Sequence, residues 1–156
     1  MLFNKIYLKM KIDAINVSIL KILQQNARMS NAEIGRQVGI SSPAVGERIK
    51  KLEDTGIIDK YQTVVSYRET GYQLKAIITM KAFVGKLVPF IKKVKSYNEV
   101  INCYRITGND NIVMEVVFKN QTHMESFIDD LILYGETKTQ IVLSKIIDNN
   151  AILPII

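Results

Sequence analysis

The chain has 156 residues, enough for one ordinary domain or two small ones joined by a linker. Apolar residues make up 47% and charged residues 23%, a balance that supports a hydrophobic core and excludes a disordered tail. The net charge is +6, and the single Cys and single His exclude a disulfide framework, a Cys-rich zinc site within one chain and most His-cluster metal centres. We therefore expect little catalytic chemistry, no cofactor and no metal.

Residues 1–13 are basic and partly apolar. Lys5, Lys9 and Lys11 interrupt any apolar core that a signal peptide would need. No stretch reaches the roughly 20 apolar residues of a membrane span. We predict a cytoplasmic protein without a membrane partner and with a short N-terminal arm, whose start is either Met1 or Met10.

A first amphipathic helix is predicted directly after the arm. Its apolar residues recur at helical spacing: Ile15, Ile19, Ile22 and Leu23. Asp13 is placed to cap the N-terminus of this helix. Asn26 lies near its C-terminal end, where Asn tolerates the left-handed conformation.

A second helix is predicted from Ser30, because Ser30 and Glu33 form the S-x-x-E pattern of a capping box. Gly39 suits the left-handed position that ends it. Only Gly39, Ile40 and Ser41 then separate this helix from the next. A joint this short forces a sharp corner, as in a helix-turn-helix.

A third helix follows, and if Ser42 caps it, Pro43 takes the first helical position, where its missing N–H costs nothing. Small side chains at its start and basic ones further along suit insertion into a major groove. Gly46 in its interior has two explanations, a close approach to DNA or tight packing against the first helix. Residues 1–60 hold 10 basic and 6 acidic side chains, a net +4, and this charge alone fits a phosphate-binding surface and a merely solvated one equally well.

We expect the DNA-contacting residues to lie on this corner and on the third helix. They are Ser30, Asn31, Ser41, Ser42, Pro43, Ala44, Glu47, Arg48, Lys50 and Lys51. Among them Lys50 and Lys51 would meet phosphates, while Arg48 would reach bases. The alternative is a three-helix bundle that binds nothing.

The β-prone run at 57–66 predicts a wing or a leading strand. Residues 67–73 then read as a hinge. We therefore assign residues 1–66 to a helix-turn-helix domain with an N-terminal arm and residues 74–156 to a second domain.

The second domain shows alternating strand patterns and two helical stripes. Strands are predicted near 74–83, 99–107, 112–118 and 137–148, and helices near 87–94 and from Gln121 or Thr122 onward. The resulting order, βαββαβ, predicts a ferredoxin-like arrangement and an α+β fold for the whole chain. Several strands carry apolar residues on both faces, such as Ile77 opposite Ile78. Because two helices cover only one sheet face, we expect the other face to pack on a second subunit.

The run from Lys11 to Val65, KIDAINVSILKILQQNARMSNAEIGRQVGISSPAVGERIKKLEDTGIIDKYQTVV, resembles the DNA-binding half of the Lrp/AsnC (feast/famine) transcription regulators. The second half resembles the effector and oligomerisation domain of that family. The resemblance covers about residues 11–150. It implies a sequence-specific, DNA-binding transcriptional regulator that forms a homodimer on double-stranded DNA and assembles further, often to an octamer.

The resemblance also implies an amino-acid effector bound near Thr107, Gly108, Asn109, Asp110 and Asn111. The family usually has Thr-Gly-Asp-Tyr-Asp there, so amides replace both expected acids in this chain. A carboxylate that could pair with an ammonium group is missing at two positions. Asp110 compensates, the ligand differs, or no ligand binds.

Two other functions compete. Some proteins of this architecture resemble haem-pathway decarboxylases, which need His and basic side chains in the second domain. Here the only His, His123, lies at a predicted helix start, and Cys103 reads as a small buried apolar residue rather than a nucleophile. The remaining alternative is a structural oligomer or metabolite sensor that does not bind DNA.

Overall fold

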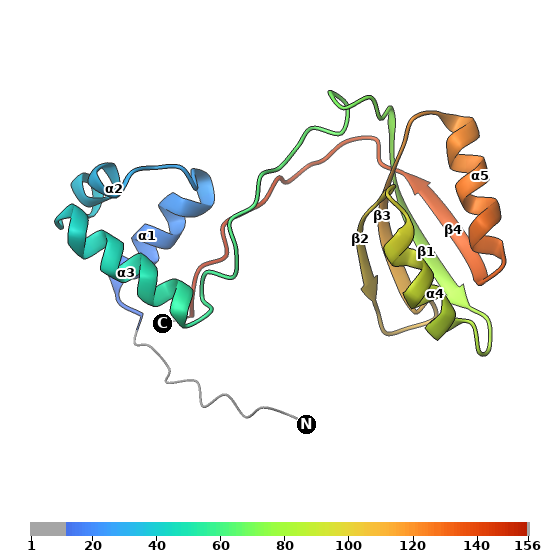
Figure 1. Cartoon of the computed structure of the whole chain (residues 1–156), viewed down its shortest axis with the longest axis horizontal. Coiled ribbons are helices and arrows are strands. Elements are labelled where there is room, and N and C mark those ends of the chain that lie inside the picture. The colour runs from blue at the N-terminus through green and yellow to red at the C-terminus, as the bar shows by residue number, and fades with distance from the viewer. Residues whose placement is uncertain (1–11, 156) are drawn as a thin grey trace. The chain divides into compact units, whose positions relative to one another are not determined.

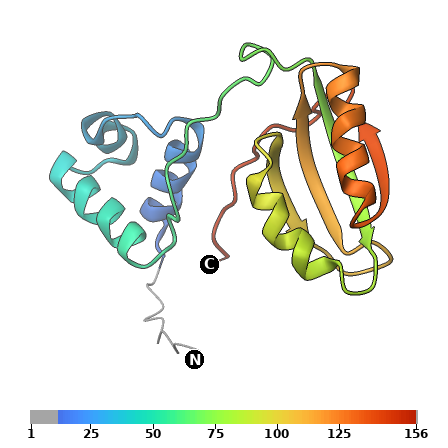
Figure 2. The same cartoon turned by 45° about the vertical axis from the view of Figure 1, so that its right-hand side comes forward.

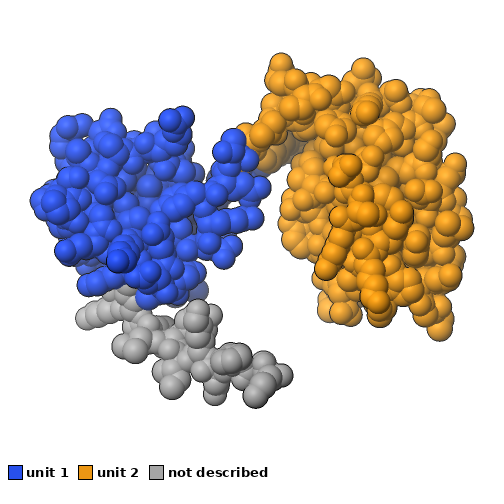
Figure 3. Space-filling model, in the orientation of Figure 1, with its two compact units in different colours: residues 1–63, 147–156 blue, residues 64–146 orange. Residues whose placement is uncertain are grey.

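The computed structural model describes residues 12–155 (Figure 1), so the N-terminal arm with both candidate start residues lies outside the described residues. The chain divides into two compact units (Figure 3). Unit 1 runs to residue 63 and also includes the chain from residue 147 onward, whereas unit 2 is residues 64–146. The chain after residue 146, which the sequence analysis assigned to the second domain, therefore clusters with the helices of unit 1.

Unit 1 contains three helices: α1 (Ala14–Gln25), α2 (Asn31–Val38) and α3 (Ser42–Asp54). They share a core of six buried apolar residues: Ile19, Leu20, Leu23, Ile34, Val45 and Leu52. The apolar face predicted for the first helix contributes Ile19 and Leu23 to this core. The sequence pattern therefore translates directly into helix packing in this unit.

The helix ends confirm most of the predicted capping. The Asp13 side chain accepts the Asn16 N–H at 2.8 Å, and the capping box of Ser30 and Glu33 is complete. Ser41, not Ser42, caps α3, so Pro43 is the second helical residue.

The prediction for Asn26 was wrong. This residue ends α1 in an extended conformation, with φ −147°, and its backbone N–H donates to the carbonyl of Ile22 at 2.8 Å. The Ile22 carbonyl at the end of α1 therefore has a hydrogen-bond partner without a left-handed residue.

The predicted strand at 57–66 is not formed in the described chain. Val64 and Val65 are 77% and 65% exposed, and no neighbouring segment pairs with the run. A β-prone segment without a partner strand has no ladder to join. The winged variant of the fold is therefore not supported here.

Unit 2 is a four-stranded antiparallel sheet in the order β2-β3-β1-β4. Its elements are β1 (Leu74–Ala82), α4 (Leu87–Lys93), a 3-10 turn η1 (Val94–Ser96), β2 (Val100–Arg105), β3 (Ile112–Phe118), α5 (Gln121–Ile132) and β4 (Gly135–Ile141). This order confirms the predicted βαββαβ arrangement. Figure 2 shows α4 and α5 over the same side of the sheet.

The core of unit 2 lies between these helices and one sheet face. Alternate residues of β1 and β3 are buried there, with Phe90 and Val94 from the α4 region and Phe127 and Leu131 from α5. Phe90 of α4 is fully buried, whereas Ile132 at the end of α5 is 54% exposed. Asn120 caps α5, so this helix begins at Gln121, one of the two predicted starts.

The strands are shorter than predicted at their free ends. β4 stops at Ile141 rather than continuing to 148, because only Leu74 and Lys75 of its neighbour β1 extend beyond the Ala76–Ile141 pair. Val142 makes one more bond, donating its N–H to the Lys75 carbonyl at 2.8 Å. β2 likewise covers 100–105 rather than 99–107.

Candidate functional site

The corner between α2 and α3 is fixed by one carbonyl. The backbone N–H groups of Gly39 and Ile40 both donate to the Gly35 carbonyl, at 2.9 and 3.1 Å. Gly39 has φ +76°, the left-handed conformation predicted for it. A Cβ on Gly35 would lie 2.5 Å from the Ile40 carbonyl oxygen, so no larger residue fits without moving the turn. The sequence analysis missed Gly35, although a glycine inside α2, three residues before its end, was the available signal.

The start of α3 presents small polar side chains. Ser41 Oγ accepts the Ala44 N–H at 3.4 Å, which places Ser42 and Pro43 in the first turn. Pro43 is exposed, and Ser42 and Ala44 are half-buried. Because these side chains are small, the backbone of α3 can approach a ligand closely at this end of the helix.

Charged side chains follow along α3. Glu47, Lys50 and Lys51 are all exposed. An exposed lysine pair on one helix supplies flexible positive charge suited to phosphate oxygens.

The predicted residues of α2 meet α3 at Gly46. Asn31 Nδ2 lies 3.2 Å from the position that a Cβ on Gly46 would occupy. Of the two explanations for Gly46, its packing neighbour is thus α2 rather than the first helix. Ser30 is exposed but engaged, because its Oγ donates to Glu33 Oε2 at 2.7 Å and accepts the Glu33 N–H at 3.3 Å.

Arg48 does not point freely outward. Its Nη1 donates to both carboxylate oxygens of Asp13, at 3.0 and 2.8 Å, and to Asn16 Oδ1 at 2.8 Å. Asn16 is only 2% exposed. The pKa of Asp13 is lowered, first by the Asn16 backbone N–H and then by the Arg48 hydrogen bond. Arg48 therefore holds α3 against the N-terminus of α1, a partner 35 residues away that helical periodicity does not reveal.

The second predicted site, residues 107–111, is the turn between β2 and β3. Gly108 has φ +117°, which glycine tolerates best, and Thr107 and Asn109 are exposed. Asp110 Oδ2 lies 3.5 Å from Lys138 Nζ of β4.

Asn111 has a structural role in that turn. Its backbone N–H donates to the Met80 carbonyl, and its Oδ1 accepts the Ala82 N–H, each at 3.0 Å. The amide oxygen is thus engaged with the end of β1. Asp110 is the acidic group that the turn offers.

The residues considered for catalysis are separate from both sites. His123 Nε2 lies 3.0 Å from Glu99 Oε1, and His123 Nδ1 accepts the Lys119 N–H at 3.2 Å. Cys103 is exposed rather than buried as expected, and partial desolvation raises the pKa of its thiol. A raised pKa disfavours the nucleophilic thiolate.

Within residues 12–155, no cluster of three or more His, Cys, Asp or Glu side chains is arranged to hold a metal ion. Over the same range, no helix has the length and apolar character needed to cross a membrane.

The chain resembles known families over most of its length. Residues 12–53 match the AsnC-type helix-turn-helix domain, and residues 75–152 match the Lrp/AsnC ligand-binding domain. Among curated relatives, the transcriptional regulator LrpB of Bacillus subtilis is 31% identical over 88% of this chain and 92% of its own. The regulator FL11 of Pyrococcus abyssi is 31% identical over 78% of this chain and 81% of its own.

Solved structures agree with the sequence comparisons. Bacillus subtilis LrpC has a TM-score of 0.83 at 28% identity, covering 90% of this chain and all of the other. The regulator NMB0573 of Neisseria meningitidis, solved in complex with L-Met, has a TM-score of 0.83 at 26% identity, covering 90% of this chain and 96% of its own.

Proposed function

The chain belongs to the Lrp/AsnC family of helix-turn-helix transcription regulators, and from this premise we propose which of its surfaces contact DNA, effector and partner subunit. The proposed DNA interface is the α2–α3 corner with the exposed face of α3. It comprises Ser30, Asn31, Ser41, Ser42, Pro43, Ala44, Glu47, Lys50 and Lys51. Arg48 enters the proposal as a positioning residue that fixes α3.

One observation carries this assignment: α3 has small side chains at its first turn, where Pro43 is exposed, and exposed basic side chains at Lys50 and Lys51. A groove-bound helix needs both a close backbone approach and phosphate contacts. The capped corner at Gly35 and Gly39 gives α3 one defined angle to α2, which supports presentation as a rigid unit.

A salt titration of DNA binding tests the interface. The variant K50A/K51A removes two proposed phosphate contacts, so the slope of log affinity against log salt should fall by about 0.9 per lost contact, roughly 1.8 in total. The matched control is K92A/K95A, which removes two exposed lysines from the α4 region of unit 2. Equal slopes for both variants would remove Lys50 and Lys51 from the interface.

The R48A variant separates positioning from base contact. We expect a lower melting temperature, because the buried Asn16 acceptor loses its partner at a cost of about 1–3 kcal/mol. The salt slope should remain that of the wild type. A normal melting temperature with lost operator preference would make Arg48 a base-reading residue instead.

We further propose a homodimer through the outer sheet face, with assembly to an octamer. Strand pairing places Ile77, Val113 and Val117 on this face, away from the helices. The face also holds Glu115, which accepts a bond from Asn102 at 2.8 Å and lies 3.7 Å from Lys75 Nζ. Size-exclusion chromatography with light scattering measures the oligomeric state. A monomer at micromolar concentration would refute the dimer.

The effector proposed is an amino acid held near Asp110. The Lrp/AsnC ligand-binding domain match and the L-Met complex of the Neisseria relative support this class of ligand. An α-ammonium group would replace Lys138 Nζ beside Asp110. A thermal-shift screen of the amino acids should show stabilisation by one of them, reduced in D110N and retained in D129N, which removes an exposed carboxylate from α5. Equal shifts in both variants would exclude Asp110 as the ammonium partner.

We propose that the protein acts in the cytoplasm and has no catalytic activity. The observations at His123 and Cys103 support this, because His123 is hydrogen-bonded through both ring nitrogens and the Cys103 thiol is disfavoured as thiolate. The absorbance spectrum of a tetrapyrrole should be the same with and without the protein. A change in that spectrum would contradict the proposal.

A further inference from the structure

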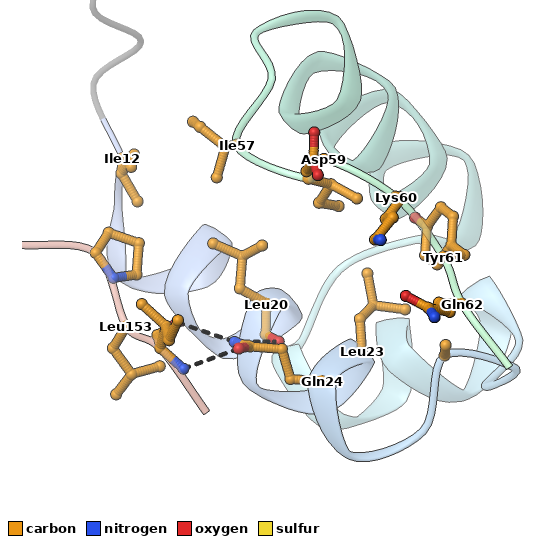
Figure 4. A pocket seen from close by; sticks show the side chains of 14 residues that line it. Ile12, Leu20, Leu23, Gln24, Ile57, Asp59, Lys60, Tyr61, Gln62 and Leu153 are labelled. Atoms are coloured by element: carbon orange, nitrogen blue, oxygen red, sulfur yellow. Dashed lines mark hydrogen bonds between the residues drawn. The ribbon is translucent and has the colours of Figure 1, made fainter. Parts of the chain in front are cut away.

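The last described residues of the chain contact α1 in unit 1. Gln24 Nε2 donates to the Ile152 carbonyl at 3.0 Å, and Gln24 Oε1 accepts the Ile152 N–H at 2.8 Å. The nitrogen and the oxygen of the Gln24 side-chain amide are thus bonded to the C=O and the N–H of the Ile152 backbone. A paired β-strand satisfies an extended segment in the same way. Figure 4 shows these bonds at the edge of a pocket.

The pocket beside this clamp is an apolar cavity of about 660 Å³. Leu20 and Leu23 of α1 line it on one side, and the chain just after α3, including Ile57, lines another. Leu153 and Pro154 complete the lining (Figure 4 labels Leu153). All of these residues lie within unit 1.

The segment's backbone and side chains contribute differently. The Ile152 side chain is 83% exposed, so this residue is held by its backbone alone. Leu153 is 47% exposed and faces the cavity together with Pro154. Residues 151–155 carry no charged side chain.

We propose that residues 151–155 are a resident peptide ligand of the DNA-binding unit. Gln24 recognises the backbone, and Leu153 and Pro154 border the cavity between α1 and the chain after α3. The segment is also the continuation of β4, the last strand of the sheet. The DNA-binding unit is therefore attached to the sheet by two chain segments, residues 64–73 and residues 142–150, rather than by one linker.

Residue-resolved hydrogen exchange on the full chain tests this proposal without DNA or effector. The Ile152 amide should exchange slowly in the wild type. In Q24A, which removes both bonds, it should exchange about tenfold faster. The control is Q25A, which removes an exposed amide from the adjacent position of α1. Ile152 protection should be unchanged there.

A second variant, L153D, tests the cavity. A carboxylate facing the apolar lining should release the segment, so protease cleavage within 147–155 should become several-fold faster than in the wild type. The α1–α3 amides serve as the folding reference in both variants. Wild-type exchange of the Ile152 amide at the unprotected rate, or identical rates in Q24A and Q25A, would overturn the proposal. Because the readout is confined to unit 1, a failure of the proposed DNA interface would leave it unaffected.

Discussion

Two glycines in adjacent helices should respond in opposite directions to the same substitution. In an isolated helix, Gly→Ala stabilises by about 1 kcal/mol. At Gly35 the new Cβ would lie 2.5 Å from the Ile40 carbonyl oxygen, a backbone atom within the corner. At Gly46 the nearest atom is the flexible Asn31 side chain, at 3.2 Å.

The magnitude follows from these contacts. Strain of about 2–3 kcal/mol at Gly35 outweighs the helix gain and leaves G35A destabilised by roughly 1–2 kcal/mol. For a unit of this size, that corresponds to a melting temperature roughly 5–15 °C lower. In G46A the Asn31 side chain can rotate away, so the melting temperature should stay constant or rise by a few degrees, about 4 °C.

Thermal melts by circular dichroism, with hydrogen exchange on α1–α3 peptides to assign the transition, provide the assay. Melting of G35A at or above the wild-type temperature would refute the steric account of the corner. DNA binding by G46A then separates the two explanations for that glycine. A stable G46A that no longer binds operator DNA indicates close approach of DNA, whereas a stable variant with normal affinity leaves packing against α2 as the reason.

Three further outcomes are expected. The pKa values of Asp13 and Glu33 are lowered by hydrogen bonds in the fold, so their stabilisation is present above the unfolded-state pKa values near 3.8 and 4.5 and is lost as pH falls through the folded ones. D13N and E33Q should therefore flatten the acid limb of the stability curve; unchanged acid limbs would contradict this. N111A should lower the stability of unit 2 by about 1–3 kcal/mol, since the Ala82 N–H loses its acceptor, and unaltered urea unfolding would contradict it. Cys103 should react with iodoacetamide more slowly than a free thiol at pH 7, because its pKa is raised, and a rate equal to that of glutathione would disagree.

Local patterns in the sequence predicted the elements of both units well. Helical spacing located the α1 core residues, and alternation located β1 and the buried face of β3. The capping box at Ser30 was also predictable, because its two partners lie within one turn of helix. Each of these features depends on residues close together in the chain.

The features that the sequence did not indicate depend on distant partners. Arg48 looked like an outward-facing base reader because Asp13 and Asn16, which hold it, lie more than 30 residues away. Gln24 looked like an ordinary surface residue, although its partner is Ile152. The run at 57–66 had strand propensity but no neighbour to pair with. Propensity and periodicity describe a segment, whereas these outcomes depend on what the segment meets.

The amide of Asn111 connects the turn between β2 and β3 to β1. Its oxygen is bonded to Ala82, at one end of β1, and the opposite end of β1, Leu74, is where the chain arrives from the DNA-binding unit. β1 is held on both sides by β3 and β4, so it forms a stiff element about 30 Å long. A displacement of the turn by a bound molecule would therefore travel along one strand to the start of the sheet.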